Sequence, residues 1–175
     1  GAGDDASRQM ARDLFSRTGV ECLDTDCTSA ELVKLFNNIS RYVHFAVANQ
    51  FALIADLYGT SIHEIIHLAN HRYPRGIIAT PGMTAGTCLR KDFGMVNEAS
   101  PYPDLTLAAW KINEFMPFFL VSHLRRRMAL HGKSVAVLGY TFKRDTDDER
   151  DSLCPKLIRY LERETPRRIA VHEPH

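Results

Sequence analysis

A run of about thirty residues without glycine or proline constrains the fold of this 175-residue chain more than any other feature. Thr28 and Glu31 open it with the S/T-x-x-E pattern of a helix N-terminus, and it ends before Gly59. A helix of that length spans on the order of 45 Å, more than the diameter of a small domain. We therefore expect a long helix over 28–58 that packs along other helices or forms a homodimer. Apolar or small residues recur along it at a spacing close to a heptad, at Leu32, Phe36, Ile39, Val43, Ala46, Leu53 and Leu57.

The segments around this run follow local start and stop signals. Before it, a short amphipathic helix over 5–17 and a brief strand over 20–23 are expected. After it, Ser61 and Glu64 repeat the capping pattern and predict a helix over 62–70. Closely spaced glycines and prolines then make 73–88 a long loop, and long loops in compact domains are usually functional. Two further helices are predicted over 89–98 and 105–130, the second kinked at Pro117.

Beyond Gly132 the pattern changes to a strand over 134–140, a helix over 148–164 and a strand over 168–173. A strand, a helix and a strand in this order form a βαβ unit, whose two strands are parallel. The chain is therefore predicted to be mainly α. We expect an entry segment at 1–27, an all-α domain at 28–131 and the beginning of an α/β domain at 132–175.

Composition excludes several classes of protein. The chain is 45% apolar and 25% charged with a net charge of +1, so it has the composition of a globular domain and offers no basic footprint for nucleic acid. The one basic run, at 125–127, is interpreted as a solvated helix end. No apolar stretch is long enough to span a membrane. Four scattered cysteines do not make a disulfide scaffold, which favours reduced thiols and a cytoplasmic location.

The segment "TPGMTAGTCLRKDF" at 80–93 holds the strongest signal of chemistry. Small residues before Cys88 leave the backbone open to a ligand. A helix N-terminus at Cys88, with Lys91 one turn later, favours the thiolate, and Asp92 adds a carboxylate. We therefore predict that Cys88 is a functional thiol. The other three cysteines, Cys22, Cys27 and Cys154, are predicted to be buried and structural.

Three motifs resemble the nucleotide-sugar 6-dehydrogenases of the UDP-glucose/GDP-mannose dehydrogenase family. "AGTCLRKD" resembles the segment around the catalytic cysteine of that family, "TSAELVKLFNN" at 28–38 one of its helices, and "GYTFKRDTDDERDS" at 139–152 a later turn. They occur in the family's order and together cover nearly the whole chain. The resemblance implies that a sugar C6 alcohol is oxidised to a carboxylate with two NAD. It also implies that Cys88 forms first a thiohemiacetal and then a thioester.

The same resemblance implies roles for eight further residues. Lys34 and Asn38 match a catalytic pair that stabilises oxygen charge, and Asp92 matches a group that orients or deprotonates water. The positions matched to groups around the nucleotide-sugar substrate are Lys91, Lys143, Arg150, Arg75 and Gly86. Arg75 matches an arginine that, in relatives, reaches towards substrate in the neighbouring subunit.

Two features depart from the family pattern. Ala85 replaces the first glycine of the usual pair before the cysteine, which requires a negative φ there. No G-x-G-x-x-G follows a strand, so the NAD-binding fingerprint is absent. We expect NAD to be bound mainly by an N-terminal domain that precedes this chain, and the chain alone to be inactive.

Alternative functions remain open on the sequence alone. Cys88 suits a cysteine hydrolase or transferase, activated by one of the eight histidines. The string H-E-I-I-H at 63–67 matches a zinc metalloprotease pattern through His63, Glu64 and His67, but no third ligand is evident and no metal is predicted. A non-catalytic dimerisation module is the third alternative. Which nucleotide sugar would be oxidised stays open.

Overall fold

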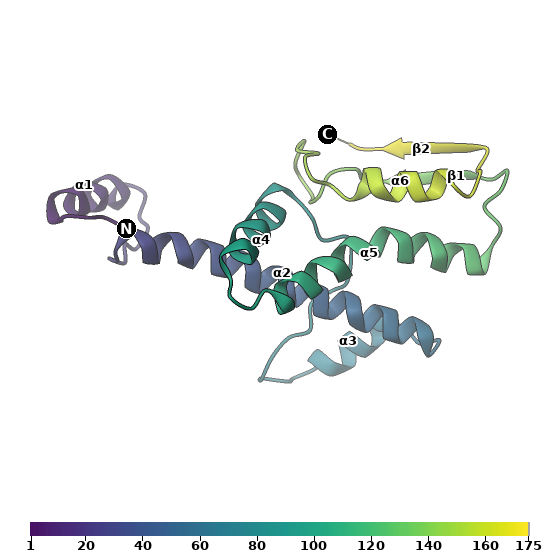
Figure 1. Ribbon diagram of the computed structural model, residues 1–175, viewed down its shortest axis with the longest axis horizontal. Coiled ribbons are helices and arrows are strands. Elements are labelled where there is room, and N and C mark those ends of the chain that lie inside the picture. The colour runs from purple at the N-terminus through teal and green to yellow at the C-terminus, as the bar shows by residue number, and fades with distance from the viewer. Residues whose placement is uncertain (175) are drawn as a thin grey trace. The chain divides into compact units, whose positions relative to one another are not determined.

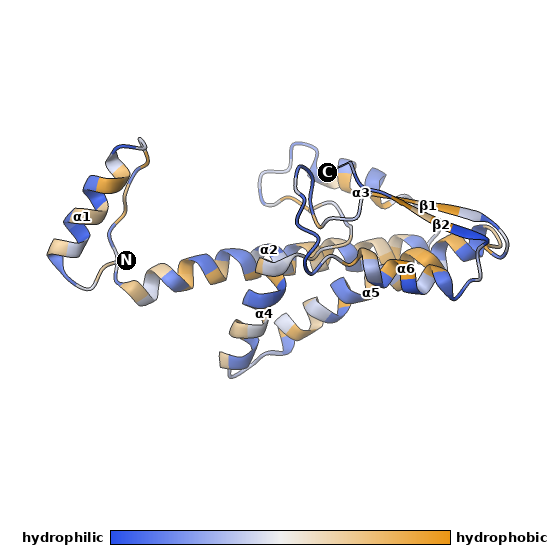
Figure 2. Ribbon diagram, turned by 90° about the horizontal axis from the view of Figure 1, so that it is seen from above, coloured by the Kyte–Doolittle hydropathy of each residue, from blue (hydrophilic) through white to orange (hydrophobic). Residues whose placement is uncertain are grey.

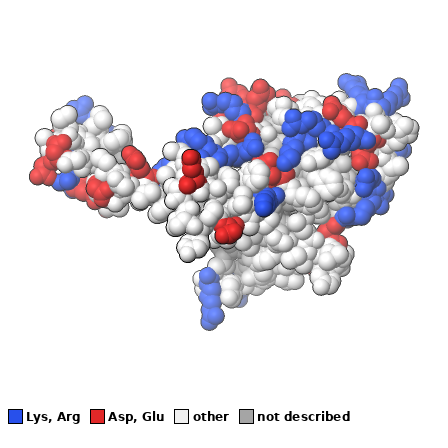
Figure 3. Space-filling view, in the orientation of Figure 1, with Lys and Arg blue, Asp and Glu red and all other residues white. Residues whose placement is uncertain are grey.

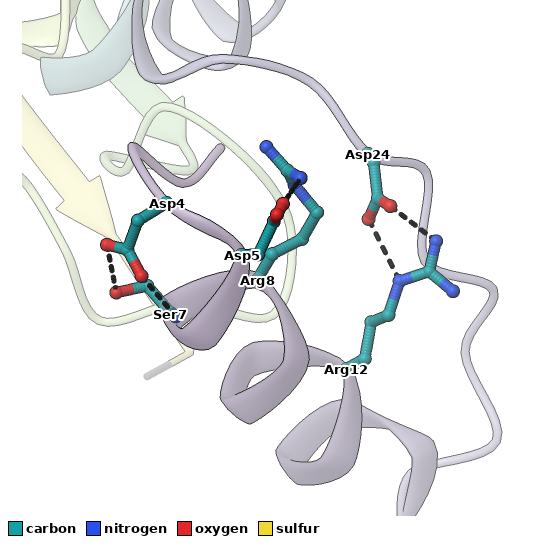
Figure 4. A network of polar contacts seen from close by, with 6 residues as sticks. All are labelled: Asp4, Asp5, Ser7, Arg8, Arg12 and Asp24. Carbon is teal, nitrogen blue, oxygen red and sulfur yellow. Dashed lines mark hydrogen bonds and ion pairs between the residues drawn. The ribbon is translucent and has the colours of Figure 1, made fainter.

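The computed structural model describes residues 1–174 and divides the chain into two compact units, Gly1–Asn38 and the remainder from Ile39 onward. The first unit holds helix α1 (Asp5–Ser16), an extended segment and the start of helix α2 (Cys27–Leu57). Asp4 caps α1 by accepting a 2.8 Å hydrogen bond from the Ser7 N–H. Arg12 ties the extended segment to α1, with its Nε 3.1 Å from Asp24 Oδ1 (Figure 4).

The strand predicted at 20–23 is wrong, because these residues form no strand in the first unit. A strand needs a hydrogen-bonded neighbour. Here the extended segment is held mainly by the Arg12–Asp24 ion pair, with one backbone bond from the Ala2 N–H to the Thr25 carbonyl at 3.3 Å. The apolar residues that suggested a strand stay partly or largely exposed, including Leu23.

Helix α2 confirms the long helix predicted from the glycine-free run, although its start was predicted at the wrong residue. The carboxylate of Asp26 accepts from the Ser29 N–H at 2.9 Å and from the Ser29 hydroxyl at 2.6 Å. Asp26 therefore caps the helix and Thr28 lies within the first turn. Hydrophobic and polar residues alternate around the helix (Figure 2).

In the second unit, α2 contacts α4 (Thr87–Ala99) and α5 (Asp104–Arg127), and α3 (Ile62–Asn70) follows α2 along the chain. The side chain of Ser61 caps α3 by accepting from the Glu64 N–H at 3.4 Å, as predicted. The ring of Phe93 lies 6.0 Å from Tyr42 and is stacked 6.0 Å from Trp110, so aromatic contacts join α2, α4 and α5. Pro117 lies inside α5. The side of α2 that faces this core carries small residues: Ala46, Ala48, Ala52 and Ala55.

The predicted βαβ unit is present. Strands β1 (Ser134–Leu138) and β2 (Arg168–His172) are parallel, with Ser134 opposite Arg168, and are joined by α6 (Cys154–Glu162), which lies alongside α5 (Figure 1). The helix predicted from 148 begins six residues later. Asp151 has a φ of +56°, which a helix does not accommodate, whereas Pro155 fits its first turn. The core of this part is built by Val121, Leu130, Val137, Cys154 and Leu161.

The mainly α fold class is thus confirmed, with six helices and one two-stranded sheet in residues 1–174. Within the same residues, no helix combines the length and apolar character needed to cross a membrane. Basic and acidic side chains are interspersed on the face drawn in Figure 3, in agreement with the small net charge.

Candidate active site around Cys88

Cys88 is exposed and lies in the first turn of α4, one residue after the start of the helix. The N-terminal end of a helix carries partial positive charge, which favours a thiolate. Lys91 lies one turn further along, and its Nζ is 3.8 Å from Oδ1 of Asp92, whose side chain is fully buried. Lys91 is thus on the same helix as Cys88, and its ammonium group is close to the Asp92 carboxylate.

Buried asparagines hold the loop that precedes Cys88. The N–H of Gly82 donates to Asn49 Oδ1 at 2.8 Å, and Asn49 Nδ2 donates to Asn113 Oδ1 at 2.8 Å. Asn113 in turn donates to the Tyr42 carbonyl at 3.2 Å. Both asparagines are fully buried, so the loop is fixed from the helical core. The sequence analysis did not predict the roles of Asn49 and Asn113. The only signal for them in the sequence is that each is an asparagine among apolar residues on a helix face.

A second anchor holds the loop at its far end. Asn70, the last residue of α3, donates to the Ile78 carbonyl at 2.9 Å and accepts from the Ile78 N–H at 2.8 Å. One amide side chain thereby replaces the backbone partner that a strand would have offered. Arg75 lies between Asn70 and Ile78 and is exposed.

Gly86 brings the turn at 139–152 against the start of α4. Its N–H donates to the Asp151 carbonyl at 3.2 Å. Its φ is +100°, and a Cβ built there would lie 2.6 Å from the ring of Phe142. Glycine is required on both counts. Ala85, by contrast, is not among the residues with positive φ, which meets the requirement predicted from the sequence.

The turn carries two of the predicted substrate-binding residues. Lys143 Nζ lies 5.7 Å from the centroid of the Phe142 ring that packs on Gly86. Arg150 binds Asp148 through two hydrogen bonds, from Nε at 2.8 Å and from Nη2 at 2.9 Å. These bonds lower the pKa of Asp148 to about 2. The hydrogen bond to Asp148 also raises the pKa of Arg150.

Polar contacts hold this turn at both ends. The carboxylate of Glu173, just after β2, accepts from the N–H groups of Tyr140 and Thr141 at 2.6 and 3.0 Å. The Ser152 hydroxyl donates to the Tyr140 carbonyl at 2.6 Å. Asp145 and Asp151 adopt left-handed conformations, which aspartate tolerates better than most residues. The turn is therefore a fixed platform for Lys143 and Arg150.

Lys34 and Asn38 are one turn apart on α2 in the first unit, and their catalytic role stays a prediction. His63 and His67 lie on α3. Among residues 1–174, no group of three or more His, Cys, Asp or Glu side chains is arranged to hold a metal ion.

The three other cysteines differ in exposure. Cys154 is buried in the core as predicted, and burial raises the pKa of its thiol. The prediction was wrong for Cys27, which is exposed, and Cys22 is only partly buried. Both lie near the beginning of α2, in the small first unit, which has little core of its own.

The fold and the site define a helical domain, joined to an α/β unit, that presents a helix N-terminal thiol beside the turn of Lys143 and Arg150. A family model described as the central domain of the UDP-glucose/GDP-mannose dehydrogenase family matches residues 28–114. The UDP-N-acetyl-D-mannosamine dehydrogenase of Methanocaldococcus jannaschii is 36% identical over 164 residues, 92% of this chain and 38% of that protein.

Solved structures agree with this match. UDP-D-ManNAc dehydrogenase from Pyrococcus horikoshii has a TM-score of 0.81 at 34% identity, covering 98% of this chain and 44% of that one. UDP-glucose dehydrogenase from Pyrobaculum islandicum has a TM-score of 0.83 at 28% identity, covering 99% and 42%. The chain belongs to the UDP-glucose/GDP-mannose dehydrogenase family. It spans 38% of the length of the Methanocaldococcus relative.

Proposed function

We propose that this chain supplies the catalytic thiol and part of the substrate site of an NAD-dependent nucleotide-sugar 6-dehydrogenase. One observation carries the proposal: Gly86 and Phe142 pack so closely that the turn with Lys143 and Arg150 lies beside the helix start that bears exposed Cys88. The family and the names of its similar members support a UDP-linked sugar as substrate. The two cations suit its diphosphate.

The chemistry needs a sulfur nucleophile because one site performs two oxidations. After the C6 alcohol has become an aldehyde, the Cys88 thiolate adds to the aldehyde carbon, and a new C–S bond gives a thiohemiacetal. Loss of a hydride from that carbon leaves a thioester. Water then attacks the thioester carbon, the C–S bond breaks, and the carboxylate and the thiol are released.

Three further residues would assist these steps. Lys34 and Asn38 would stabilise the charge that develops on the substrate oxygen, an effect worth roughly a hundredfold to a thousandfold in rate for such donors. Asp92, a fully buried carboxylate on the helix of Cys88, would orient or deprotonate the hydrolytic water. Arg75, exposed in the loop at 71–86, would complete the substrate site, and in a dimer it would reach the neighbouring subunit.

The described residues do not themselves fit NAD. In a dinucleotide-binding βαβ unit, the turn after the first strand cradles a phosphate with glycines and free N–H groups. Here the Glu173 carboxylate takes the N–H groups of Tyr140 and Thr141 after β1. A phosphate at that position would meet a negative charge. The proposal therefore assigns NAD, the hydride acceptor, to residues outside this chain.

A homodimer through α2 is the second part of the proposal. Three large side chains on its second-unit portion share one helical face at i, i+4 and i+7 spacing, namely Val47, Phe51 and Ile54, and Tyr58 follows in the turn after the helix. All four are 38–79% exposed. A contiguous apolar row of this kind marks a protein–protein interface.

A variant of the full-length parent protein tests the covalent mechanism. Cys88→Ser should spare the first hydride transfer far more than the second, because a serine hydroxyl without an adjacent base is a poor nucleophile at neutral pH. We expect overall turnover to be lost while reduction of a supplied sugar aldehyde by NADH remains measurable. Lys34→Ala should slow both stages. If Cys88→Ser still produced two NADH per sugar at close to the wild-type rate, the proposed covalent role would be wrong.

A further inference from the structure

A buried carboxylate lies where the helical domain meets the α/β unit. Glu114 on α5 is 9% exposed and contacts two cations from different elements. Lys156 of α6 donates from Nζ to the Glu114 carbonyl at 2.7 Å and to Oε2 at 3.0 Å. Arg90 of α4 places Nη2 3.1 Å from Oε1, an ion pair without hydrogen-bond geometry.

Arg90 extends this cluster to the turn beside the thiol. Its Nη1 donates to Asp151 Oδ1 at 3.2 Å. Arg90 follows Cys88 by two residues on α4, and Asp151 is the neighbour of Arg150. The carbonyl of Asp151 also accepts from the Gly86 N–H, so side chain and backbone of one residue join the turn to the start of α4.

We propose that Arg90, Glu114 and Asp151 are positioning residues that hold the turn bearing Arg150 beside the start of α4, which bears Cys88. The inference rests on the proposed function only in assuming that Cys88 is the reacting thiol. Glu114 is fixed by Lys156 and directs the Arg90 side chain. Arg90 then clamps the turn through Asp151. The three residues act through the position of the turn that carries Arg150.

The negative charges of Asp151 and Glu114 allow a positioning role to be distinguished from a direct electrostatic effect on the Cys88 thiol. Asp151 and Glu114 are anions, so their neutralisation would by charge alone favour the thiolate and speed its alkylation. If they act by positioning the turn that carries Arg150, neutralisation loosens that turn, moves its cation away from the thiol and slows alkylation. The two roles therefore predict opposite changes in one rate.

The measurement is the alkylation rate of Cys88 by iodoacetamide in the 175-residue chain, mapped by mass spectrometry at about pH 7 and about pH 10. Asp151→Asn, Glu114→Gln and Arg90→Gln should each slow Cys88 at about pH 7, by roughly two- to fivefold, the range of an exposed charge pair. All rates should converge at about pH 10, where the thiolate predominates. Asparagine tolerates the left-handed backbone at position 151, so Asp151→Asn leaves the turn unstrained.

Two further variants serve as references. Arg125→Gln removes the ion pair with Glu164 (3.3 Å), which joins the end of α5 to the residues after α6 without contact to the turn. It should leave the Cys88 rate unchanged. Arg150→Gln should slow Cys88 at least as much as the positioning variants. The double variant of Arg90→Gln with Asp151→Asn should be no slower than the slower single variant, because both remove one contact.

Each outcome separates the hypotheses. Faster or unchanged alkylation in Asp151→Asn and Glu114→Gln, with Arg150→Gln slow, overturns the positioning role and leaves the proposed function intact. An unchanged rate in Arg150→Gln overturns the positioning role and also removes Arg150 from the site around the thiol. The turnover test of Cys88→Ser is independent of both.

Discussion

At position 86 the backbone has a φ of +100°, and the nearest atom to an added Cβ is a carbon of the Phe142 ring at 2.6 Å. Gly94, eight residues later and inside α4, has open space around it and no positive φ. The two glycines therefore differ in purpose. The first lets the turn of Lys143 approach the thiol, whereas the second is an exposed helix residue with no packing role.

Alanine at these two positions should have opposite effects on stability. Gly86→Ala should lower the free energy of unfolding by about 2–4 kcal/mol, combining backbone strain with overpacking against Phe142. Gly94→Ala should raise it by about 0.5–1 kcal/mol, because alanine loses less entropy in a helix. Urea unfolding of both variants checks this. Equal effects of the same sign would contradict the packing assigned to Gly86.

Tyr42 predicts a specific loss of stability at high pH. Burial raises its pKa to about 12 from 10.0, and the charge of Glu114 acts in the same direction. The folded state therefore keeps a proton that the unfolded chain releases. The associated stability is fully present below about pH 10 and is lost as the pH rises through about 12.

Tyr42→Phe should remove that part of the pH dependence. The difference between wild type and variant in free energy of unfolding should change by on the order of 2 kcal/mol between about pH 9 and about pH 12, because two pKa units correspond to roughly that energy. Chemical denaturation across this range is the measurement. Parallel curves for the two proteins would show that the Tyr42 hydroxyl does not titrate differently on folding.

At the scale of elements, the loop at 71–86 has few backbone partners of its own and is positioned by asparagines. Asn49 of α2 holds Gly82, and Asn70 of α3 holds Ile78. Asn49 also donates a hydrogen bond to the buried side-chain oxygen of Asn113 on α5. The position of Cys88 therefore depends on α2, α3 and α5 as well as on its own helix.

Replacing Asn49 tests this dependence. Asn49→Leu has similar volume but leaves the part-buried Gly82 N–H and the buried Asn113 Oδ1 without this partner, which should cost about 2–4 kcal/mol of stability for two such groups. Amide hydrogen exchange at Gly82 should accelerate markedly. Asn97→Leu removes one part-buried hydrogen bond, to Thr106 (3.1 Å), and serves as the control with unchanged exchange at Gly82. Unchanged exchange in Asn49→Leu would refute the anchoring role.

At the scale of the whole molecule, the exposed apolar row on α2 that includes Phe51 and Ile54 bears on whether the chain forms a dimer. The second unit buries the alanine side of α2, whereas Phe51 and Ile54 stay 38% and 45% exposed. Exposing several large apolar side chains in one row costs hydrophobic free energy that a second copy would recover. A C2 dimer pairs such a row with itself.

Light scattering should therefore show a dimer at tens of micromolar. Phe51→Lys should shift the chain towards monomer, because a lysine at the centre of the row would be desolvated against apolar side chains. Met95→Lys on α4, where Met95 is 54% exposed, is the matched control and should stay dimeric. A wild-type monomer at this concentration would exclude the interface on α2.

The sequence alone determined most of the helices and the parallel βαβ unit, and it singled out Cys88 as the candidate thiol, because periodicity, caps and glycine or proline signals are local properties. Only the tertiary structure decided the contacts of Asn49, the Phe142 ring on Gly86 and the Arg90–Glu114 pair. Each joins residues tens of positions apart, and no local pattern specifies which surfaces meet when helices dock. The tertiary structure also decided where α6 starts. The turn before α6 is fixed by its hydrogen bonds with Gly86 and Glu173, which override the helical pattern of its own residues.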